Sequence, residues 1–260
     1  MKKQERVVIE NIAPVLNNGD FYIKRVVNEI VTVSADVMAD GHDVIAASVL
    51  YKHEKEKKWQ EVRMQPHHNN HWQASFVVKK QGYYAYKVVG WVDYALNWQH
   101  GIERKIADKQ HVNSELLEGI SFVNKCELTA SASEKKYLKH LAEIFADANA
   151  YHEAITEAVS EKLHHIFYNH PEKILLNSSK ELQVYVDRIK ARFSTWYEFF
   201  PRSASQKNDV HGTFKDCEKL LPRVAEMGFD TLYFPPVHPI GEVNRKGKNN
   251  TTEALKGDVG

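Results

Sequence analysis

The sequence is poor in cysteine: its 260 residues include only two, Cys126 and Cys217. They lie far apart and form none of the short Cys/His spacings that bind metal ions. Disulfides are rare in the reducing cytoplasm, where free thiols are the rule. We therefore expect two free thiols and a cytoplasmic protein.

Long apolar runs and an excess of one charge are missing as well. No apolar stretch approaches the roughly 20 residues that a membrane-spanning helix needs. Glu10 interrupts the apolar run Val7–Ile9, so we expect no signal peptide. Lys and Arg number 35 against 34 Asp and Glu, a formal net charge of +1. This balance gives no electrostatic reason to expect nucleic acid or a membrane as a partner.

The 14 histidines could suggest a metal site. His67, His68 and His71 flank an Asn-Asn pair, which is typical of a turn. His164 and His165 are adjacent on a predicted helix, where neighbours face different directions. Solvated surface histidines are therefore a better interpretation than a zinc site, and we predict no metal and no cofactor.

Residues 1–110 show the pattern of a β-domain. Short runs rich in β-branched and aromatic residues alternate with turn signals such as Gly41 and Gly82, which is typical of an antiparallel sandwich. The pattern resembles an immunoglobulin-like module without its cysteine pair. The predicted strands are 26–35, 44–51, 59–64, 72–78 and 83–93.

Aromatic residues are dense in this region, and they allow two interpretations. One is an exposed platform for stacking sugars, as in a carbohydrate-binding module. The other is core packing, which we favour because strands are enriched in aromatics and a platform requires exposure. The residues concerned are Trp59, Trp72, Tyr83, Tyr84, Tyr86, Trp91, Tyr94 and Trp98.

Residues 111–180 predict a small helical bundle, and the helical period already begins near Ile102. Ser133 is the predicted N-cap of a helix over 133–146, and a second helix is predicted over 152–167. Each has an apolar stripe that we expect to pack internally. The stripes are Leu138, Leu141, Ile144 and Phe145, and Ile155, Val159, Leu163, Ile166 and Phe167.

Residues 181–260 predict the beginning of a parallel α/β domain. Leu182–Asp187 alternates as a strand, and two further strand-like runs end at prolines, in 194–203 and 228–241. A helical segment, Phe214–Met227, lies between them. Strand, helix and strand in this order predict a βαβ unit with parallel strands.

Two motifs in the last region are specific. Pro-Pro-Val-His-Pro-Ile-Gly at 235–241 is followed by Arg-Lys-Gly-Lys-Asn-Asn at 245–250. With these motifs the chain resembles the maltose-1-phosphate maltosyltransferases of the α-amylase superfamily, and the resemblance thins between 122 and 180. Further matching stretches are 6–10, 24–27, 33–36, 40–43, 114–119, 184–188, 196–203, 211–214 and 227–230.

This resemblance implies an architecture and an activity. The family begins with a sandwich, carries a helical insertion and continues with a (β/α)8 barrel, and it is dimeric. Its members transfer maltosyl units from maltose-1-phosphate to the non-reducing end of α-1,4-glucans, with retention. The alternatives are a related glucan hydrolase or branching enzyme, or, for this chain alone, a non-catalytic glucan-binding or dimerisation module.

The resemblance also implies site residues. Barrel active sites lie at the C-terminal ends of the strands, and there Lys246 is the expected contact to the donor maltosyl unit, with Asn249 and Asn250. Arg202 and His238 are weaker candidates.

No catalytic residue is expected within the chain. Retaining transfer needs a nucleophilic carboxylate and a carboxylic acid/base, and in this superfamily these follow the fourth and fifth strands. The chain supplies about two strands, so we expect a fragment that is inactive alone. Its carboxylates in this region match no catalytic motif: Asp209, Asp216, Glu226, Asp230 and Glu242.

Overall fold

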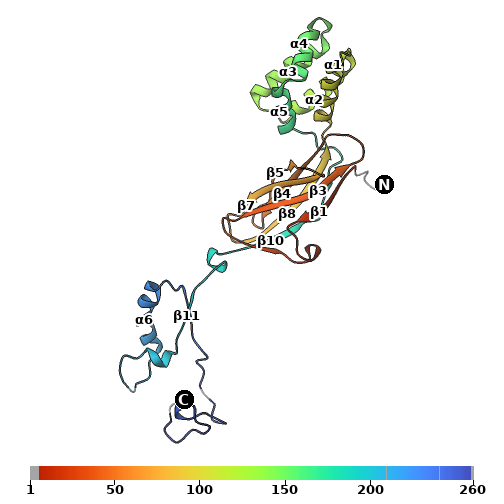
Figure 1. Cartoon of the computed structure of the whole chain (residues 1–260). Coiled ribbons are helices and arrows are strands. Elements are labelled where there is room, and N and C mark those ends of the chain that lie inside the picture. The colour runs from red at the N-terminus through yellow and green to blue at the C-terminus, as the bar shows by residue number, and fades with distance from the viewer. Residues whose placement is uncertain (1–5, 209, 240, 259–260) are drawn as a thin grey trace. The chain divides into compact units, whose positions relative to one another are not determined.

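The computed structural model describes residues 6–208, 210–239 and 241–258. The chain divides into two compact units, Met1–Arg188 and Ile189–Gly260. Figure 1 labels the elements, and each unit is described by itself. Two residues named above lie outside the described residues: the carboxylate Asp209, and Ile240 of the motif at 235–241.

The first unit contains two sheets. One has the strand order β1-β3-β7-β6 and is antiparallel throughout. The other has the order β2-β10-β8-β4-β5, with β9 paired to β8. The first sheet comprises Val7–Ala13 (β1), Ile30–Ala39 (β3), Gln65–Pro66 (β6) and His71–Val77 (β7). The second comprises Ile23–Val26 (β2), Ile45–His53 (β4), Gln60–Arg63 (β5), Gly82–Val92 (β8), Asn177–Ser178 (β9) and Leu182–Asp187 (β10).

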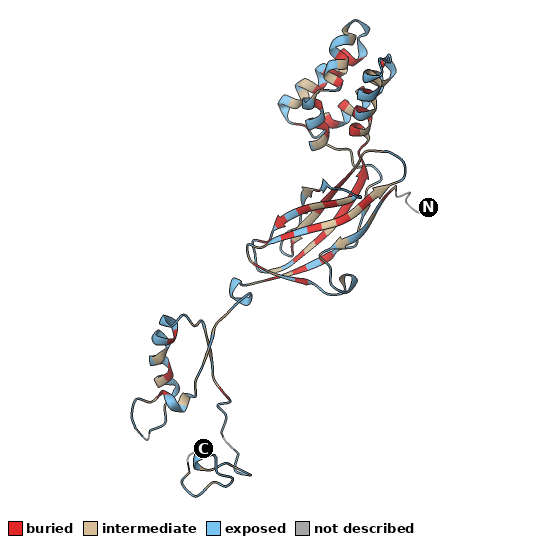
Figure 2. Cartoon of the chain, in the orientation of Figure 1, coloured by how far each residue is buried: buried red, intermediate tan, exposed pale blue. Residues whose placement is uncertain are grey.

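The two sheets share one apolar core. Along β3 the side chains of Val31, Val33 and Ala35 are buried while their neighbours are more exposed, because successive strand residues point to opposite faces. They cluster with Val49 of β4 and Tyr86 of β8 from the other sheet. The buried positions follow the strands as bands in Figure 2. The predicted alternation is therefore confirmed for this strand.

Strand β10 lies elsewhere than the sequence indicated. The sequence pattern assigns Leu182–Asp187 to the third region, but this strand pairs antiparallel with β8 and parallel with β2. Its alternate residues Leu182, Val184 and Val186 are buried in the core of the two sheets. The partners are distant in sequence, and local alternation carries no information about which sheet a strand joins.

Helices α1 to α5 follow β8 and form a second core (Figure 1). They begin earlier than expected, because Asp93 caps α1 by accepting a hydrogen bond from the N–H of Leu96 at 3.3 Å. Tyr94 and Trp98, which we had assigned to the β-domain, therefore lie on α1. The bounds are Tyr94–Ala107 (α1), Asn113–Glu127 (α2), Ala132–Ala146 (α3), Tyr151–Ala158 (α4) and Glu161–Asn169 (α5).

Two serines define helix starts that the sequence placed differently. Ser131, not Ser133, caps α3, where it forms a capping box with Glu134, because the box needs the acidic residue three positions after the cap. The helix predicted over 152–167 is two helices, since Ser160 accepts from the N–H of Leu163 at 3.2 Å and starts α5.

The two predicted apolar stripes differ in how fully they are buried. The first is buried as predicted. In the second, Val159 falls in the break between α4 and α5 and is exposed, and Ile155 is only partly buried. The residues of both stripes that are buried are Leu138, Leu141, Ile144, Phe145, Leu163, Ile166 and Phe167.

Arg63 of β5 joins the sheets to the helices. Its Nη2 donates to Oδ2 of the buried Asp93 at 3.0 Å. Its guanidinium lies 4.7 Å from the ring centroid of Trp91 and 4.5 Å from that of Tyr168. Burial raises the pKa of Asp93 although Arg63 opposes it. The pair thus holds the start of α1 and the end of α5 against the second sheet.

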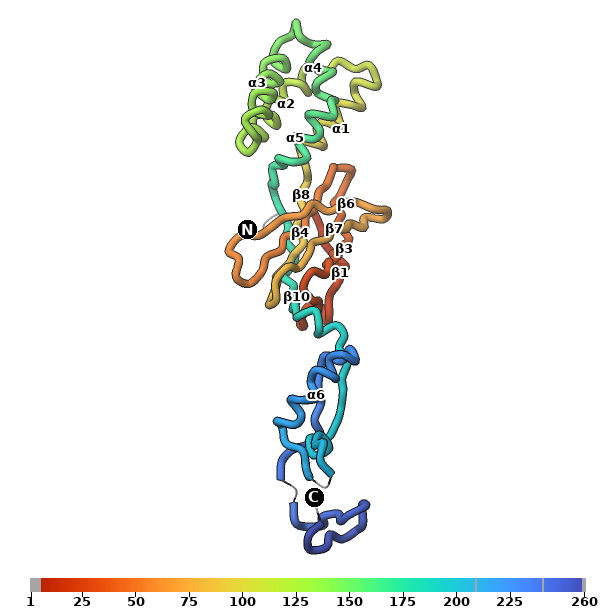
Figure 3. The backbone as a smooth tube through the Cα atoms, turned by 90° about the vertical axis from the view of Figure 1, so that its left-hand side faces the viewer, coloured from red at the N-terminus to blue at the C-terminus, as the bar shows by residue number. Residues whose placement is uncertain are grey.

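The described residues of the second unit form one α-helix and a two-stranded sheet. Strands Trp196–Glu198 (β11) and Thr231–Tyr233 (β12) are parallel, and Phe214–Glu226 (α6) connects them. The predicted βαβ order and strand direction are confirmed. Figure 3 shows α6 and the segments around it in tube form. Over the whole of the chain that the structure describes, no helix is long and apolar enough to cross a membrane.

Candidate functional site

In the second unit, hydrogen bonds between the residue before β11 and the residues before β12 hold the starts of these two strands together. The N–H of Thr195 donates to Oδ1 of Asp230 at 3.1 Å, and its hydroxyl donates to the carbonyl of Gly228 at 2.9 Å. Gly228, with φ of 86°, ends the turn after α6, and glycine adopts this conformation without strain. Because β11 and β12 are parallel, the segments after both strands leave at the same edge of the sheet.

Aromatic rings pack beside these two strands. Ring centroids lie 5.1 Å apart for Tyr197 and Phe229, 5.3 Å for Phe199 and Phe234, and 5.8 Å for Phe214 and Phe234. The rings link β11, the start of α6 and the residues flanking β12. The segment that carries the candidate residues therefore leaves the sheet from a packed aromatic layer.

The three candidate substrate residues lie on one loop after β12. The N–H of Gly247 donates to the carbonyl of Thr251 at 3.0 Å, and the N–H of Asn250 donates to that of Gly247 at 3.2 Å. Lys246 directly precedes this closed turn, and Asn249 and Asn250 form its tip. Both asparagines have positive φ, 58° and 63°, which asparagine tolerates better than most residues.

The side chains of Lys246, Asn249 and Asn250 are exposed, and none has a hydrogen bond or ion pair with any described residue. An ammonium group and two amides thus face solvent on a loop whose backbone is closed. Such neutral and cationic donors can bind the hydroxyl groups of a sugar. The role of these three residues as sugar contacts stays a prediction.

Sequence reasoning missed Asp258, which closes the base of this loop. Its Oδ2 accepts from the N–H of Leu255 at 2.8 Å and of Lys248 at 3.3 Å, and its carbonyl accepts from Nη2 of Arg245 at 2.5 Å. Those N–H groups hold the pKa of the Asp258 carboxyl below its usual range. The only signal in the sequence was a Gly-Asp pair, which is ordinary turn chemistry.

The weaker candidates lie apart from these interactions. Arg202 is exposed in a short 3-10 helix, Pro201–Ala204, and its guanidinium is 6.0 Å from the ring centroid of Phe200. Its carbonyl accepts from the N–H of Gly212 at 2.8 Å. His238 is exposed.

The aromatic residues of the first unit are mostly core. Those that are buried are Trp72, Tyr84, Tyr86, Trp91 and Trp98. Tyr83 is 40% exposed and packs against Tyr22 and Tyr185 at centroid distances of 5.7 and 5.1 Å. Packing therefore accounts for most of the aromatic content, in agreement with the interpretation that we favoured.

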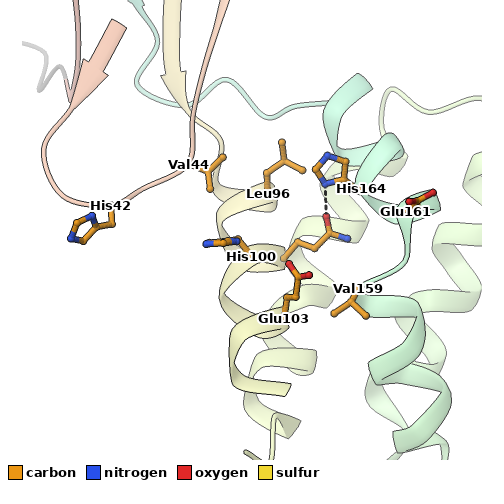
Figure 4. A pocket seen from close by; sticks show the side chains of 9 residues that line it. His42, Val44, Leu96, His100, Glu103, Val159, Glu161 and His164 are labelled. Carbon is orange, nitrogen blue, oxygen red and sulfur yellow. Dashed lines mark hydrogen bonds between the residues drawn. The ribbon is translucent and has the colours of Figure 1, made fainter. Parts of the chain in front are cut away.

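Figure 4 shows a cavity of about 450 Å³ in the first unit. It lies between the β3–β4 loop, α1 and the start of α5. The buried Gln99 donates to the carbonyls of Ala158 and Ser160 and makes a 3.0 Å hydrogen bond with Nδ1 of His164. His42 and His100 also line the cavity. The polar groups of Gln99 are thus used within the protein, and no residue that we singled out as a sugar contact lines the cavity.

The cysteines and histidines form no metal centre in the described part of the chain. Cys126 and Cys217 are both buried and free, as predicted. Burial raises the pKa of the Cys126 thiol to about 12, which keeps it protonated and unreactive.

Comparison with known proteins decides the family. A sequence model described as alpha-1,4-glucan:maltose-1-phosphate maltosyltransferase, domain N/S, matches residues 5–188. The chain belongs to this family. The match ends at the same residue as the first compact unit, Arg188, so the domain N/S region of the maltosyltransferase family corresponds to the two sheets with their helices.

Relatives in the maltosyltransferase family extend the similarity through the second unit. The chain is 39% identical over 259 residues to the alpha-1,4-glucan:maltose-1-phosphate maltosyltransferase of Methylacidiphilum infernorum, and 41% identical over 258 residues to that of Chlorobaculum tepidum. A third, from Myxococcus xanthus, is 37% identical. The alignments cover 98 to 99% of this chain but only 38 to 39% of those relatives. The chain thus spans about two fifths of their length.

Proposed function

We propose that this chain is part of an enzyme that transfers maltosyl units from α-maltose-1-phosphate to the non-reducing end of α-1,4-glucans, with retention. The observation that carries the proposal is the 39% identity to a named maltosyltransferase over 99% of the chain, which includes the loop with Lys246. Family membership rests mainly on the first unit. The exposed donors after β12 supply the chemistry expected for a sugar contact.

In this proposal the second unit begins a (β/α)8 barrel. The support is the parallel pair β11 and β12 with α6 between them, since such barrels repeat this unit and place their active sites beyond the strand ends. The two sheets form an immunoglobulin-like sandwich and α1 to α5 a helical insertion. We thus divide the chain into a sandwich, a bundle and a barrel start. The bundle begins at Tyr94 rather than near 110, and the barrel starts after Arg188 rather than near 180, because β10 belongs to the sandwich.

The proposed donor contacts are Lys246, Asn249 and Asn250. The ammonium of Lys246 has three donors for sugar hydroxyls, and each asparagine amide offers donors and an acceptor. The nucleophile and the acid/base belong to later barrel strands, so the chain alone is inactive. No cofactor and no metal take part. The enzyme is a cytoplasmic homodimer that binds neither nucleic acid nor membranes.

The test is phosphate release by the full-length protein from maltose-1-phosphate with a maltooligosaccharide acceptor. Lys246→Met keeps the apolar stem and removes the charge, so we expect the KM for maltose-1-phosphate to rise about tenfold or more. Lys256→Met is the matched control on the same loop and is expected to behave like the parent. Absence of phosphate release would overturn the proposal, and release of reducing sugar instead would indicate a hydrolase.

The asparagines need a different substitution. Because Asn249 and Asn250 have positive φ, alanine would add backbone strain to the loss of the amide. Asn250→Gly removes the amide while it permits the conformation. A KM for maltose-1-phosphate that is raised in Asn250→Gly would support the donor contact, and an unchanged KM would remove Asn250 from the proposed site.

A binding or dimerisation role for the isolated chain is tested separately. Calorimetric titration with maltoheptaose would reveal a glucan site among the exposed tyrosines, and light scattering would reveal a dimer. We expect a dimer without glucan binding, because most of the aromatic residues are buried in the core.

A further inference from the structure

One residue, Asp258, makes several of the hydrogen bonds that close the loop from Arg245 to Asp258. Both N–H donors to the Asp258 carboxylate, from Leu255 at 2.8 Å and Lys248 at 3.3 Å, bind the same oxygen, Oδ2. The backbone carbonyl of Asp258 accepts from Nη2 of Arg245 at 2.5 Å. Asp258 thus contacts the chain on both sides of Lys246: at Arg245 immediately before it and at Lys248 two residues after it.

Gly247 shows how closely the loop packs at this point. A Cβ built there would lie 2.4 Å from the carbonyl oxygen of Glu253 and 2.8 Å from Oδ2 of Asp258. Contacts below 3.0 Å require a shift of the neighbouring atoms. Arg245 is also half-buried, and its Nε is fully buried without a partner among the described residues. The residues that flank Lys246 are therefore fixed, whereas its own side chain is exposed.

The charges around Asp258 agree with an anchoring role. Arg245 and Lys248 are the cationic groups that act on its carboxylate, and they reinforce the hydrogen bonds from the N–H groups in lowering its pKa. The carboxylate is therefore ionised at neutral pH. No other acidic side chain of this loop makes a hydrogen bond or ion pair with the described residues: Glu253 contributes only its backbone carbonyl, to the hydroxyl of Thr251.

We propose that Asp258 is a positioning residue: its carboxylate holds the backbone N–H of Lys248 and its carbonyl holds the guanidinium of Arg245, so that the ammonium of Lys246 between them is presented to the donor sugar. This inference rests on the proposed function, because it gives Lys246 a donor to bind. It requires no direct contact between Asp258 and substrate. The positioning role explains why the Asp258 carboxylate accepts hydrogen bonds from the backbone N–H groups of Lys248 and Leu255.

The first test measures loop order in the present chain and needs no activity. In Asp258→Ala, amide hydrogen exchange at Lys248 and Leu255 is expected to be about tenfold faster, because both lose their acceptor. Asp258→Asn keeps an oxygen acceptor and should retain most of the protection. Glu253→Ala removes a carboxylate from the same loop and should change neither amide. Equal exchange in Asp258→Ala and the parent would overturn the inference.

The second test uses the full-length enzyme and a double-mutant cycle. Asp258→Ala is expected to raise the KM for maltose-1-phosphate about tenfold with little change in kcat, and Asp258→Asn to restore most of the loss. In a Lys246→Met background Asp258→Ala should add little, because its effect passes through Lys246. Full additivity, or an unchanged KM in Asp258→Ala, would overturn the inference.

Different results would overturn the proposed function and the positioning role of Asp258. A parent enzyme that releases no phosphate overturns the proposed function and, with it, the donor role of the loop. An active parent whose KM is insensitive to Asp258→Ala overturns only the positioning role.

Discussion

The two units of the chain differ in how completely they cover their apolar surface. In the first unit, two sheets and five helices build the core clusters that contain Tyr86 and Phe167. In the described part of the second, few apolar side chains are buried, among them Ala204, Cys217 and Val224, while Trp196 is 60% and Phe214 55% exposed. Figure 2 shows this contrast in burial.

The difference follows from the number of layers. A parallel sheet needs cover on both faces, and one helix beside two strands cannot supply it within the described residues. The first unit thus contains every element that its hydrophobic pattern requires. The second contains the predicted local structure with few packing partners among the described residues, which shows that a βαβ unit can be specified by local sequence.

The largest expected effect comes from separating the units. Residues 1–188 expressed alone should unfold in a cooperative thermal transition, because their cores are complete. Residues 189–260 alone should show none, because a two-stranded sheet is at best marginal in water. Circular dichroism melts of both polypeptides test this expectation. A cooperative transition in 189–260 would remove the contrast between the units.

A smaller effect is expected at the buried ion pair that holds the helices to the sheets. Arg63→Ala leaves the carboxylate of Asp93, only 1% exposed, without its partner, so the free energy of unfolding should fall by about 3 kcal/mol. Chemical denaturation at pH 7 measures this loss. Arg104→Ala, at an exposed arginine of α1, is the control and should cost a few tenths at most.

This effect should also depend on pH. Burial raises the pKa of Asp93 above the ordinary aspartate value of 3.8, so its contribution to stability is greatest below that value and falls as pH rises through the folded-state pKa. Loss of Arg63 raises that pKa further. The deficit of Arg63→Ala should therefore be smaller at pH 4 than at pH 7, and equal deficits would contradict the assignment.

The smallest effect is expected at the capping box, a helix-start motif that occurs in both units. Ser131 of α3 and Thr213 of α6 each form a capping box. Ser131→Ala should lower the free energy of unfolding of the first unit by about 1 kcal/mol. Thr213→Ala should leave that transition unchanged and only speed amide exchange in α6. If both variants shift the main transition equally, the two units unfold together.

The sequence predicted what depends on local pattern. Alternation identified β3, the apolar stripe of α3 was correct, and strand, helix and strand at 194–241 became a parallel βαβ unit. It failed where a partner far along the chain decides the outcome, as for β10. It also failed where two caps compete, as at Ser131 and Ser133, because only the three-residue spacing to Glu134 separates them.

The residues of the candidate site also differ in whether the sequence could predict them. Lys246, Asn249 and Asn250 came from a family resemblance, and the structure places all three on one closed loop. Asp258 was missed because its role depends on backbone N–H groups that converge on one oxygen. No residue pattern reveals such convergence before the loop has its shape.

The position of β10 has a consequence for the order in which the chain is made. β2 has β10 as its neighbour in the sheet, and β10 separates it from β8. A ribosome must therefore synthesise Leu182–Asp187 before the N-terminal strand Ile23–Val26 can be paired. Helices α1 to α5, whose contacts are nearer in sequence and form faster, emerge before that moment. During synthesis the helical bundle is complete while the sheet beneath it still lacks an inner strand.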